Sequence, residues 1–232
     1  MRNILINGGT SGIGKEVALC LAKNKENNIL VTGRNKKALE ELTGETGNRN
    51  ILTHQIDMEE FEKYKSPFQK FVENHLRHID ILINNAGLLI VNDFLKSSTD
   101  EARKMMETNF FGPAALIRSL NPLMQRGSHI VNISSMGGFQ GSSKYRGLSY
   151  YSASKAALSS LSECLAEEFN ESGIIVNCLA LGSVGTGMLE KAFPGYKAPV
   201  TAAEMAEFIS WFAINGSRFF NGKVLPVAFS NP

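Results

Sequence analysis

The chain has 232 residues, 43% of them hydrophobic and 20% charged, and its formal net charge is +2. This composition is that of an ordinary globular protein, and the length suffices to bury a substantial core. No block of charge in the sequence suggests nucleic-acid binding, and no apolar run approaches the length that spans a membrane. An apolar segment begins within three residues of Met1, which leaves no room for a signal peptide. We therefore expect a cytoplasmic protein with neither nucleic-acid nor membrane partners.

The cysteine and histidine residues indicate neither disulfide bonds nor a metal site. Cys20, Cys164 and Cys178 are odd in number, far apart and set in apolar patterns. Reduced thiols in the cytoplasm explain this usage better than a disulfide framework does. The four histidines share no ligand spacing, so we expect no bound metal.

A glycine-rich turn follows the first apolar segment. Residues 3–7 form a short apolar run, residues 8–14 read GGTSGIG, and an amphipathic helical pattern begins directly afterwards. Between a strand and a helix, glycines let the backbone approach a pyrophosphate, and the helix amino terminus offers it free N–H groups. The spacing Gly-x-x-x-Gly-x-Gly is one residue longer than the commonest dinucleotide fingerprint, and a turn that merely reverses the chain is the alternative.

Strand and helix patterns alternate along the whole chain. This alternation predicts an α/β fold in which a single Rossmann-like domain, residues 1–232, holds a doubly wound parallel sheet of about seven strands with helices on both faces. The expected strands lie near residues 3–7, 28–32, 51–55, 80–84, 128–133, 173–180 and 222–228.

The longest expected helix begins at Ser98. Residues 98–101, STDE, form a capping box, and Pro113 is expected to kink the helix further on. The glycine- and serine-rich residues 137–149 are expected to form a loop beside the active site.

Tyr151 and Lys155 stand four residues apart at the start of a second expected helix. Residues at this spacing share a helix face, so a phenol and an ammonium can meet there. A tyrosine that works as an acid/base catalyst needs its pKa lowered by roughly 2 to 3 units, and a nearby cation supplies such a shift. The spacing alone also fits an ordinary surface pair. Tyr145 and Tyr150 have serine, not lysine, four residues on.

Five separated segments together resemble the classical short-chain dehydrogenase/reductases, from about residue 3 to residue 188. They are GGTSGIG at 8–14, NNAG at 84–87, NISS at 132–135, YSASK at 151–155, and Asn109. The resemblance implies an oxidoreductase that interconverts a carbonyl and an alcohol on a small molecule with a nicotinamide cofactor.

The resemblance implies four catalytic residues. Tyr151 would give or take the proton of the substrate oxygen, and Lys155 would stabilise the phenolate and hydrogen-bond the nicotinamide ribose. Ser135 would hold the substrate oxygen; Ser134 competes for this role, but period-two alternation lets only one of the two point into the site. Asn109 would fix Lys155 through water, with a buried amide that satisfies helix backbone groups as the alternative.

The end of the second strand bears on the choice of cofactor. Enzymes that select NAD usually carry a carboxylate there, whereas this chain has Arg34, whose planar guanidinium suits a phosphate. We therefore expect NADP rather than NAD, although Ser11 stands where a second basic residue is often found. With Tyr151 and Lys155, the cofactor-binding set implied by the resemblance is Gly8, Thr10, Ser11, Gly12, Ile13, Arg34, Asp57, Met58, Asn85, Ala86, Gly87, Val184 and Thr186.

The substrate and the assembly are less defined. A 3-oxoacyl-carrier-protein reductase is the specific alternative, and a non-catalytic NADP-sensing or scaffold protein is the alternative of another class. The intact Asn109, Ser135, Tyr151 and Lys155 argue against the latter, because a sensor has no need of a tuned phenol. Apolar residues in the stretches near 99–124 and 151–171 indicate a homodimer or homotetramer.

Overall fold

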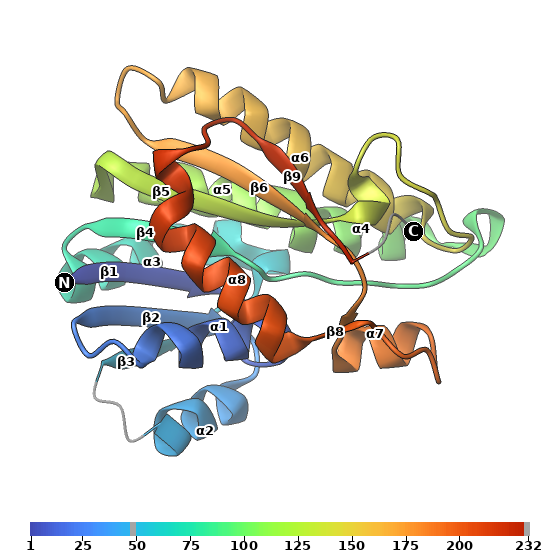
Figure 1. Ribbon diagram of the computed structural model, residues 1–232, viewed down its shortest axis with the longest axis horizontal. Helices are drawn as coiled ribbons and strands as arrows, with labels where there is room; N and C mark the ends of the chain where they lie inside the picture. The colour runs from blue at the N-terminus through green and yellow to red at the C-terminus, as the bar shows by residue number, and fades with distance from the viewer. Residues whose placement is uncertain (47–49, 230–232) are drawn as a thin grey trace.

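A seven-stranded, all-parallel sheet forms the centre of the molecule, which we describe from a computed structural model over residues 1–46 and 50–229. The strand order is β3-β2-β1-β4-β5-β6-β9. This confirms the expected doubly wound α/β class (Figure 1). The strands are β1 Arg2–Asn7, β2 Asn27–Gly33, β3 Ile51–Gln55, β4 Ile79–Asn84, β5 Met124–Ser135, β6 Ile175–Leu181 and β9 Val224–Val227.

Helices cover both faces of the sheet because each strand alternates its side chains between two cores. On β1, Ile4 and Ile6 belong to one core and Leu5 to the other, and all three are fully buried. The first core packs under α1 Gly12–Ala22, α2 Lys36–Thr46 and α8 Ala202–Asn215. The second packs under α3 Phe61–Leu76, α5 Gly112–Leu120 and α6 Ser149–Glu168.

The helix predicted to begin at Ser98 does so, and its capping box is present. Ser98 Oγ accepts from Glu101 N at 3.1 Å, and Ser98 N donates to Glu101 Oε2 at 2.8 Å. The helix is irregular at a different place from the one we expected: α4 Thr99–Met106 passes into a π-helical stretch, Glu107–Phe111, before α5 begins. Pro113 lies in the first turn of α5, where its missing N–H costs little. The wider π turn therefore precedes the proline.

A short second layer lies beyond the carboxyl ends of the strands, at the right of Figure 1. It consists of a two-stranded pair, β7 Val184–Gly185 with β8 Val200–Thr201, and the helix α7 Gly187–Ala192. The sequence did not predict this pair, because two-residue strands carry no period. Residues 137–149 form the predicted loop, apart from a 3-10 turn, Met136–Gly138, at their start and Ser149 at the beginning of α6.

The register aligns four polar residues in one row across the carboxyl end of the sheet. Thr32 pairs with Asn7, Asn7 with Asn84, and Asn84 with Asn132. The strand order reverses between β1 and β4, and open α/β sheets bind ligands where this happens. The fold therefore places the candidate site above this row.

Candidate active site

The glycine turn between β1 and α1 closes tightly against its neighbours. The amides of Gly8 and Gly9 both donate to Thr32 O, at 2.9 and 3.0 Å. Gly8 has φ 85°, a conformation that favours glycine. A Cβ on Gly14 would collide with Gly8 O and with the Asn85 side-chain amide. These two positions require glycine because the backbone is crowded there.

The amino terminus of α1 suits an anionic group. Ser11, its N-cap residue, has no side-chain capping bond within the described residues, and the first turn of the helix holds no acidic residue. Helix N–H groups and the positive end of the dipole therefore face outward at the glycine turn. This chemistry fits the pyrophosphate of a dinucleotide.

The loop after β4 joins the glycine turn to the centre of the site. The amides of Asn85 and Ala86 both donate to Asn7 O, and Asn85 Nδ2 donates to Gly8 O at 2.7 Å. At Gly87 a Cβ would lie 3.4 Å from Lys155 Nζ and 3.5 Å from Asn109 Oδ1. The NNAG segment thus runs from the turn to the Lys155 amine.

A second side of the site comes from the segment after β6. A Cβ on Gly12 would lie 3.4 Å from Thr186 Cγ2, so the glycine turn and this segment approach each other. Thr186 caps α7 by accepting from Leu189 N at 3.2 Å, and Val184 is buried. An open hollow of about 310 Å³ lies here, lined by Gly185, Thr186, Gly187, Leu189, Glu190 and Tyr196.

The residues expected near the adenosine lie around the ends of β2 and β3. Arg34 is exposed just beyond β2, and Gln55 Nε2 donates to its carbonyl at 3.0 Å. Thr10 lies against Gly33, and Ser11 is exposed. Asp57 caps a 3-10 turn, Met58–Glu60, by accepting from Glu59 N at 3.0 Å. The Met58 side chain is buried in the core beneath α5.

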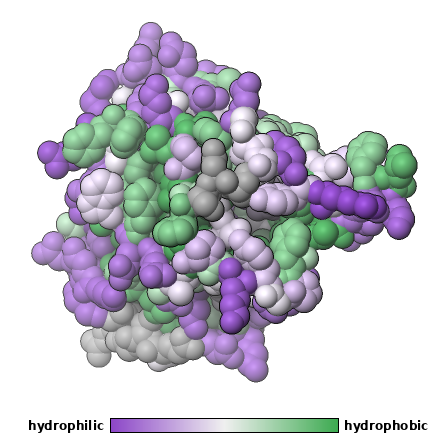
Figure 2. Space-filling model, turned by 45° about the vertical axis from the view of Figure 1, so that its right-hand side comes forward, coloured by the Kyte–Doolittle hydropathy of each residue, from purple (hydrophilic) through white to green (hydrophobic). Residues whose placement is uncertain are grey.

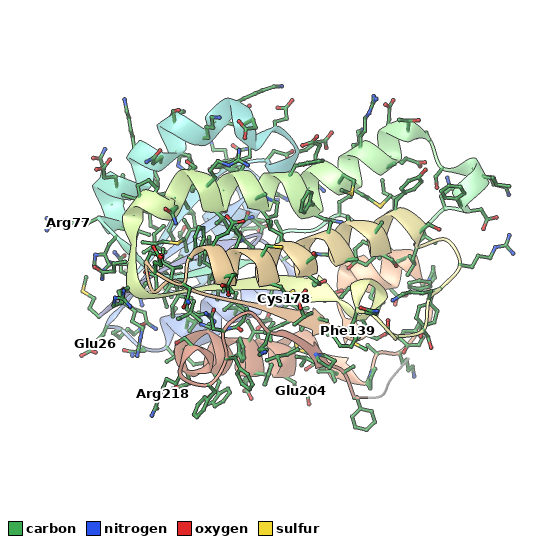
Figure 3. The ribbon with its side chains drawn as sticks, turned by 90° about the horizontal axis from the view of Figure 1, so that it is seen from above. Glu26, Arg77, Phe139, Cys178, Glu204 and Arg218 are labelled. Carbon is green, nitrogen blue, oxygen red and sulfur yellow. The ribbon has the colours of Figure 1, made fainter. Side chains whose placement is uncertain are left out.

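Tyr151 and Lys155 lie on one face of α6, but their polar atoms bond different partners. The phenol hydrogen-bonds the Ser135 hydroxyl, and Lys155 Nζ donates to Ile133 O at 2.9 Å. Burial lowers the pKa of Lys155 from 10.5 to about 8, and the nearby Cys178 thiol acts weakly in the opposite direction. Cys178 lies on β6 beneath α6 (Figure 3).

The pKa of Tyr151 moves in the opposite direction from our expectation. Burial raises it, because the phenolate loses solvation, and the hydrogen bond from Ser135 offsets only part of this effect. A nearby cation would lower the pKa of the phenol, but the Lys155 amine bonds Ile133 O, and desolvation at this partly buried position has the larger effect. The chain on its own therefore holds Tyr151 as a neutral phenol.

Ser134 and Ser135 point to opposite sides, as the alternation of the strand requires. Ser134 is buried and donates to Lys155 O at 2.8 Å, which joins β5 to α6. Ser135 is partly exposed, accepts from Gly137 N at 3.2 Å and faces Tyr151. Only Ser135 is therefore placed to meet a substrate.

Asn109 is fully buried in the π-helical stretch. Its Oδ1 accepts from Leu88 N at 2.7 Å, and its Nδ2 donates to Leu88 O and to Ser154 Oγ, both at 2.9 Å. These bonds are those of a buried amide that satisfies backbone groups, which was the alternative to its catalytic role. Its proximity to Gly87 and Lys155 keeps it beside the reacting groups, and its action on Lys155 through water stays a prediction.

Sequence reasoning missed the polar side chains that support this site. Asn84 Nδ2 donates to Asn132 Oδ1 and Asn132 Nδ2 to Ser162 Oγ, both at 2.8 Å. Ser154 donates to Tyr151 O at 2.7 Å, and Ser159 donates to Ser134 Oγ at 2.9 Å. The available signal was the spacing of residues 154, 155, 158, 159 and 162, which marks one buried face of α6.

The part of the chain that the structure describes holds neither a cluster of metal ligands nor a helix able to span a membrane. Within residues 1–46 and 50–229, no three His, Cys, Asp or Glu side chains gather as metal ligands would. In the same part of the chain, no helix combines the length and the apolar character needed to cross a bilayer.

Comparison with known proteins assigns the family. Residues 2–197 match the family model described as short chain dehydrogenase. Dehydrogenase/reductase SDR family member 7B of Danio rerio is 36% identical over 202 residues, which cover 83% of this chain and 64% of that protein. Nodulation protein G of Rhizobium sp. (strain N33) is 30% identical over 239 residues, covering 97% of this chain and 95% of that protein.

Solved structures agree with this assignment. A short chain dehydrogenase from Shigella flexneri 2a str. 301, complexed with NADP, superposes with a TM-score of 0.88 at 26% identity, covering 97% of this chain and 96% of that one. The protein ElxO, with NADP bound, superposes with a TM-score of 0.85 at 28% identity and the same coverage. The chain belongs to the short-chain dehydrogenase family, whose members are NAD(P)-dependent oxidoreductases.

Proposed function

We propose that this chain, as one domain of residues 1–232, is an NADP(H)-dependent oxidoreductase that interconverts a carbonyl and an alcohol on a small molecule. The observation that carries the proposal is the set of groups at the carboxyl end of β5. There the Tyr151 phenol hydrogen-bonds the Ser135 hydroxyl, and the Lys155 amine donates to Ile133 O on the same strand. A proton donor, an oxygen-binding hydroxyl and a cation are what carbonyl reduction requires.

Each of these groups has a distinct task in the proposed reaction. Tyr151 is held protonated, so it donates its O–H to the substrate oxygen in reduction and takes the proton back in oxidation. Ser135 donates a hydrogen bond to the same oxygen. Lys155, with a pKa of about 8, is protonated at neutral pH and favours the phenolate once the proton has moved. The nicotinamide, when bound, supplies or accepts the hydride.

NADP is the proposed cofactor because of the residues around the end of β2. Arg34 is exposed there beside the turn that holds Thr10, and the position has no carboxylate that would repel a phosphate. The Shigella protein and ElxO are both relatives solved with NADP. The remaining cofactor contacts are proposed for the glycine turn, Asp57, the NNAG segment and the segment after β6.

The function is tested with a panel of ketones, aldehydes and secondary alcohols, each assayed with NADPH and with NADH. We expect turnover of at least one carbonyl with NADPH, and competitive inhibition by the matching alcohol. Tight NADPH binding without turnover across the panel would favour the sensing or scaffold alternative. This chain spans only 64% of the length of the Danio rerio relative. The name of that relative therefore identifies no substrate for this chain.

We also propose that the protein assembles as a homodimer through α4–α5 and α6. Four apolar residues of these helices, Met105, Leu116, Ile117 and Leu158, are buried within the chain and cannot serve an interface. Phe111 is 50% exposed, and it supports the contact together with partly exposed neighbours. A tetramer would need a second face, for which Phe208 and Trp211 of α8 are exposed. Light scattering distinguishes the dimer from a 25.4 kDa monomer.

A cytoplasmic location is part of the same proposal. All three cysteines are free thiols: Cys178 is buried, Cys20 is half-buried and Cys164 is exposed. An exposed free thiol is compatible with a reducing compartment.

A further inference from the structure

Two loops beside the candidate site are joined by an ion pair. They are residues 92–94, in the segment after β4, and residues 146–150, which span the end of the loop before α6 and the first two residues of that helix. Arg146 donates from Nε to Asp93 Oδ1 and from Nη2 to Asp93 Oδ2, both at 2.7 Å. The two-pronged geometry matches the guanidinium fork to both carboxylate oxygens, which makes it stronger than a single surface contact.

The residues on either side of Asp93 contact the same segment. Asn92 N donates to Gly147 O at 3.0 Å, and the rings of Phe94 and Tyr150 stack with centroids 5.5 Å apart. Three consecutive residues thus each hold a different residue of the opposite loop. We call these contacts, between residues 92–94 and 146–150, the loop latch.

The loop latch joins the segment that follows the NNAG residues to the start of α6. Residues 92–94 follow the NNAG segment, whose amides are bonded to the end of β1. Residues 146–150 lead directly into Tyr151 in the first turn of α6. Both loops project past the carboxyl ends of the strands (Figure 1), and Figure 2 shows a projection at the right of the molecule on which hydrophilic and hydrophobic side chains lie next to each other.

The hydrogen bonds of the Ser142 and Lys144 side chains stay within the loop before α6. Ser142 Oγ bonds the carbonyls of Met136 and Phe139, and Lys144 Nζ bonds Phe139 O and Ser142 Oγ. Phe139 lies near the end of α6 that carries the site (Figure 3). The residues just before Tyr151 are therefore held against the rest of the protein by the buried side chain of Leu148 and by the loop latch.

Each member of the ion pair stabilises the charged form of the other. Arg146 holds the pKa of the Asp93 carboxyl below its ordinary value, and Asp93 raises that of Arg146. Lys96 Nζ is a second cation near Asp93, at 3.8 Å. The Arg146 side chain is 87% exposed, so salt screens the pair and its contacts can open and close in solution.

We propose that the loop latch is a positioning device that seats the first turn of α6, and with it Tyr151, against Ser135, and closes one side of the substrate entrance. The inference rests on the proposed function, because it concerns the placement of the proposed proton donor. Asp93 and Arg146 are positioning residues that do not touch the substrate. A displaced phenol has poorer geometry for proton transfer, so its kcat falls, and an opened entrance raises the KM for the carbonyl.

The kinetic test compares Asp93→Asn with Asp100→Asn, which makes the same charge change at an exposed position in the first turn of α4. We expect Asp93→Asn to lower kcat/KM for the carbonyl about tenfold, with both kcat and KM affected. The Kd for NADPH stays unchanged, because the glycine turn lies outside the loop latch. Asp100→Asn should behave as the unaltered protein.

Two further variants identify the ion pair as the cause. Arg146→Lys keeps the charge and loses the fork, and it should show a smaller loss of the same kind. Asp93→Arg alone opposes two guanidinium groups, and the exchange Asp93→Arg with Arg146→Asp should recover part of its activity. Recovery is incomplete because Lys96 then faces an arginine. In the unaltered protein the KM should rise with ionic strength, whereas Asp93→Asn should lack this dependence.

Limited trypsin digestion tests the loop latch without any turnover. We expect the bond after Lys144 to be cut about fivefold faster in Asp93→Asn than in the unaltered protein or Asp100→Asn. Equal cleavage rates would overturn the proposal whatever the carbonyl assays give. Faster cleavage with unchanged kcat and KM would overturn it as well, since the loop latch would then be merely structural. Failure of the unaltered protein to turn over any carbonyl would refute the proposed function separately.

Discussion

The floor and the mouth of the candidate site are built from opposite kinds of interaction. The floor is the row of Thr32, Asn7, Asn84 and Asn132, whose side chains are at most 1% exposed. Its members bond one another and α6, as in the 2.8 Å bonds that join Asn84, Asn132 and Ser162. The mouth is held by the loop latch, whose Arg146 side chain is 87% exposed.

This difference predicts a rigid floor and a mouth that can vary. A buried amide that loses its partner keeps the full desolvation penalty, so the floor tolerates few changes. An exposed ion pair exchanges its bonds with water at little net cost, so the mouth can open or be rebuilt. We therefore expect the floor to support the chemistry that the family shares, and the mouth to select this chain's own substrate.

The largest effect should come from Tyr151, the proposed proton donor, which hydrogen-bonds Ser135 and directly follows the loop latch. Tyr151→Phe keeps the ring and removes the transferred proton, so we expect turnover to fall about 100- to 10,000-fold with NADPH binding nearly unchanged. Tyr145→Phe, at a tyrosine that is 48% exposed in the adjacent loop, is the matched control. Turnover close to that of the unaltered protein on a verified carbonyl would contradict the mechanism.

The contrast in stability is tested by one change in each region. Asn132→Ala leaves Asn84 Nδ2 without an acceptor, removes one of the two hydrogen bonds of Ser162 Oγ and opens a cavity, so it should lower the free energy of unfolding by about 3 kcal/mol. Asp93→Asn should lower it by less than about 1 kcal/mol. Urea denaturation at one fixed protein concentration measures both, and similar losses would remove the distinction between floor and mouth.

Lys155, which is buried beside the floor, should make the free energy of unfolding depend on pH with a definite sign. Folding lowers its pKa from 10.5 to about 8, so between these values only the unfolded state keeps the proton. Stability rises with pH wherever the unfolded state binds more protons. Between about pH 7.5 and 9.5 the free energy of unfolding of the unaltered protein should therefore gain about 2 kcal/mol relative to Lys155→Met.

Burial raises the pKa of Cys178 and that of Tyr151 above their ordinary values of 9.0 and 10.0. Above those pH values, these two groups lower the free energy of unfolding as the pH rises. Both groups are present in the unaltered protein and in Lys155→Met, so the comparison largely cancels their effect. A constant difference between the two proteins across this pH range would show that Lys155 keeps an ordinary pKa.

The sequence predicted the strands and motifs around the site better than the contacts between its loops, for a physical reason. The seven sheet strands, the glycine turn and the helix face shared by Tyr151 and Lys155 follow from local periods and short motifs, and these are present in the structure. The loop latch joins residues 53 positions apart, so no local pattern could reveal it. The raised pKa of Tyr151 was missed because burial depends on the tertiary fold.

The smallest predicted effect concerns Arg34, which is exposed and therefore contributes an electrostatic term that salt weakens. The unaltered protein should bind NADPH more tightly than NADH. Arg34→Asp removes an attraction for the phosphate and adds a repulsion. The Kd for NADH divided by the Kd for NADPH should therefore fall about tenfold or drop below one.

The control for this change is Arg77→Asp, which alters the net charge equally at the end of α3, far from the carboxyl edge of the sheet (Figure 3). It should leave the ratio unchanged. Higher ionic strength should reduce the NADPH preference of the unaltered protein and of the control, because the phosphate carries more charge than the ribose hydroxyl it replaces. Equal Kd values for the two cofactors in the unaltered protein would count against NADP as the preferred cofactor. That outcome would leave the roles of Tyr151 and Ser135 untouched, since neither contacts the adenosine end of the site.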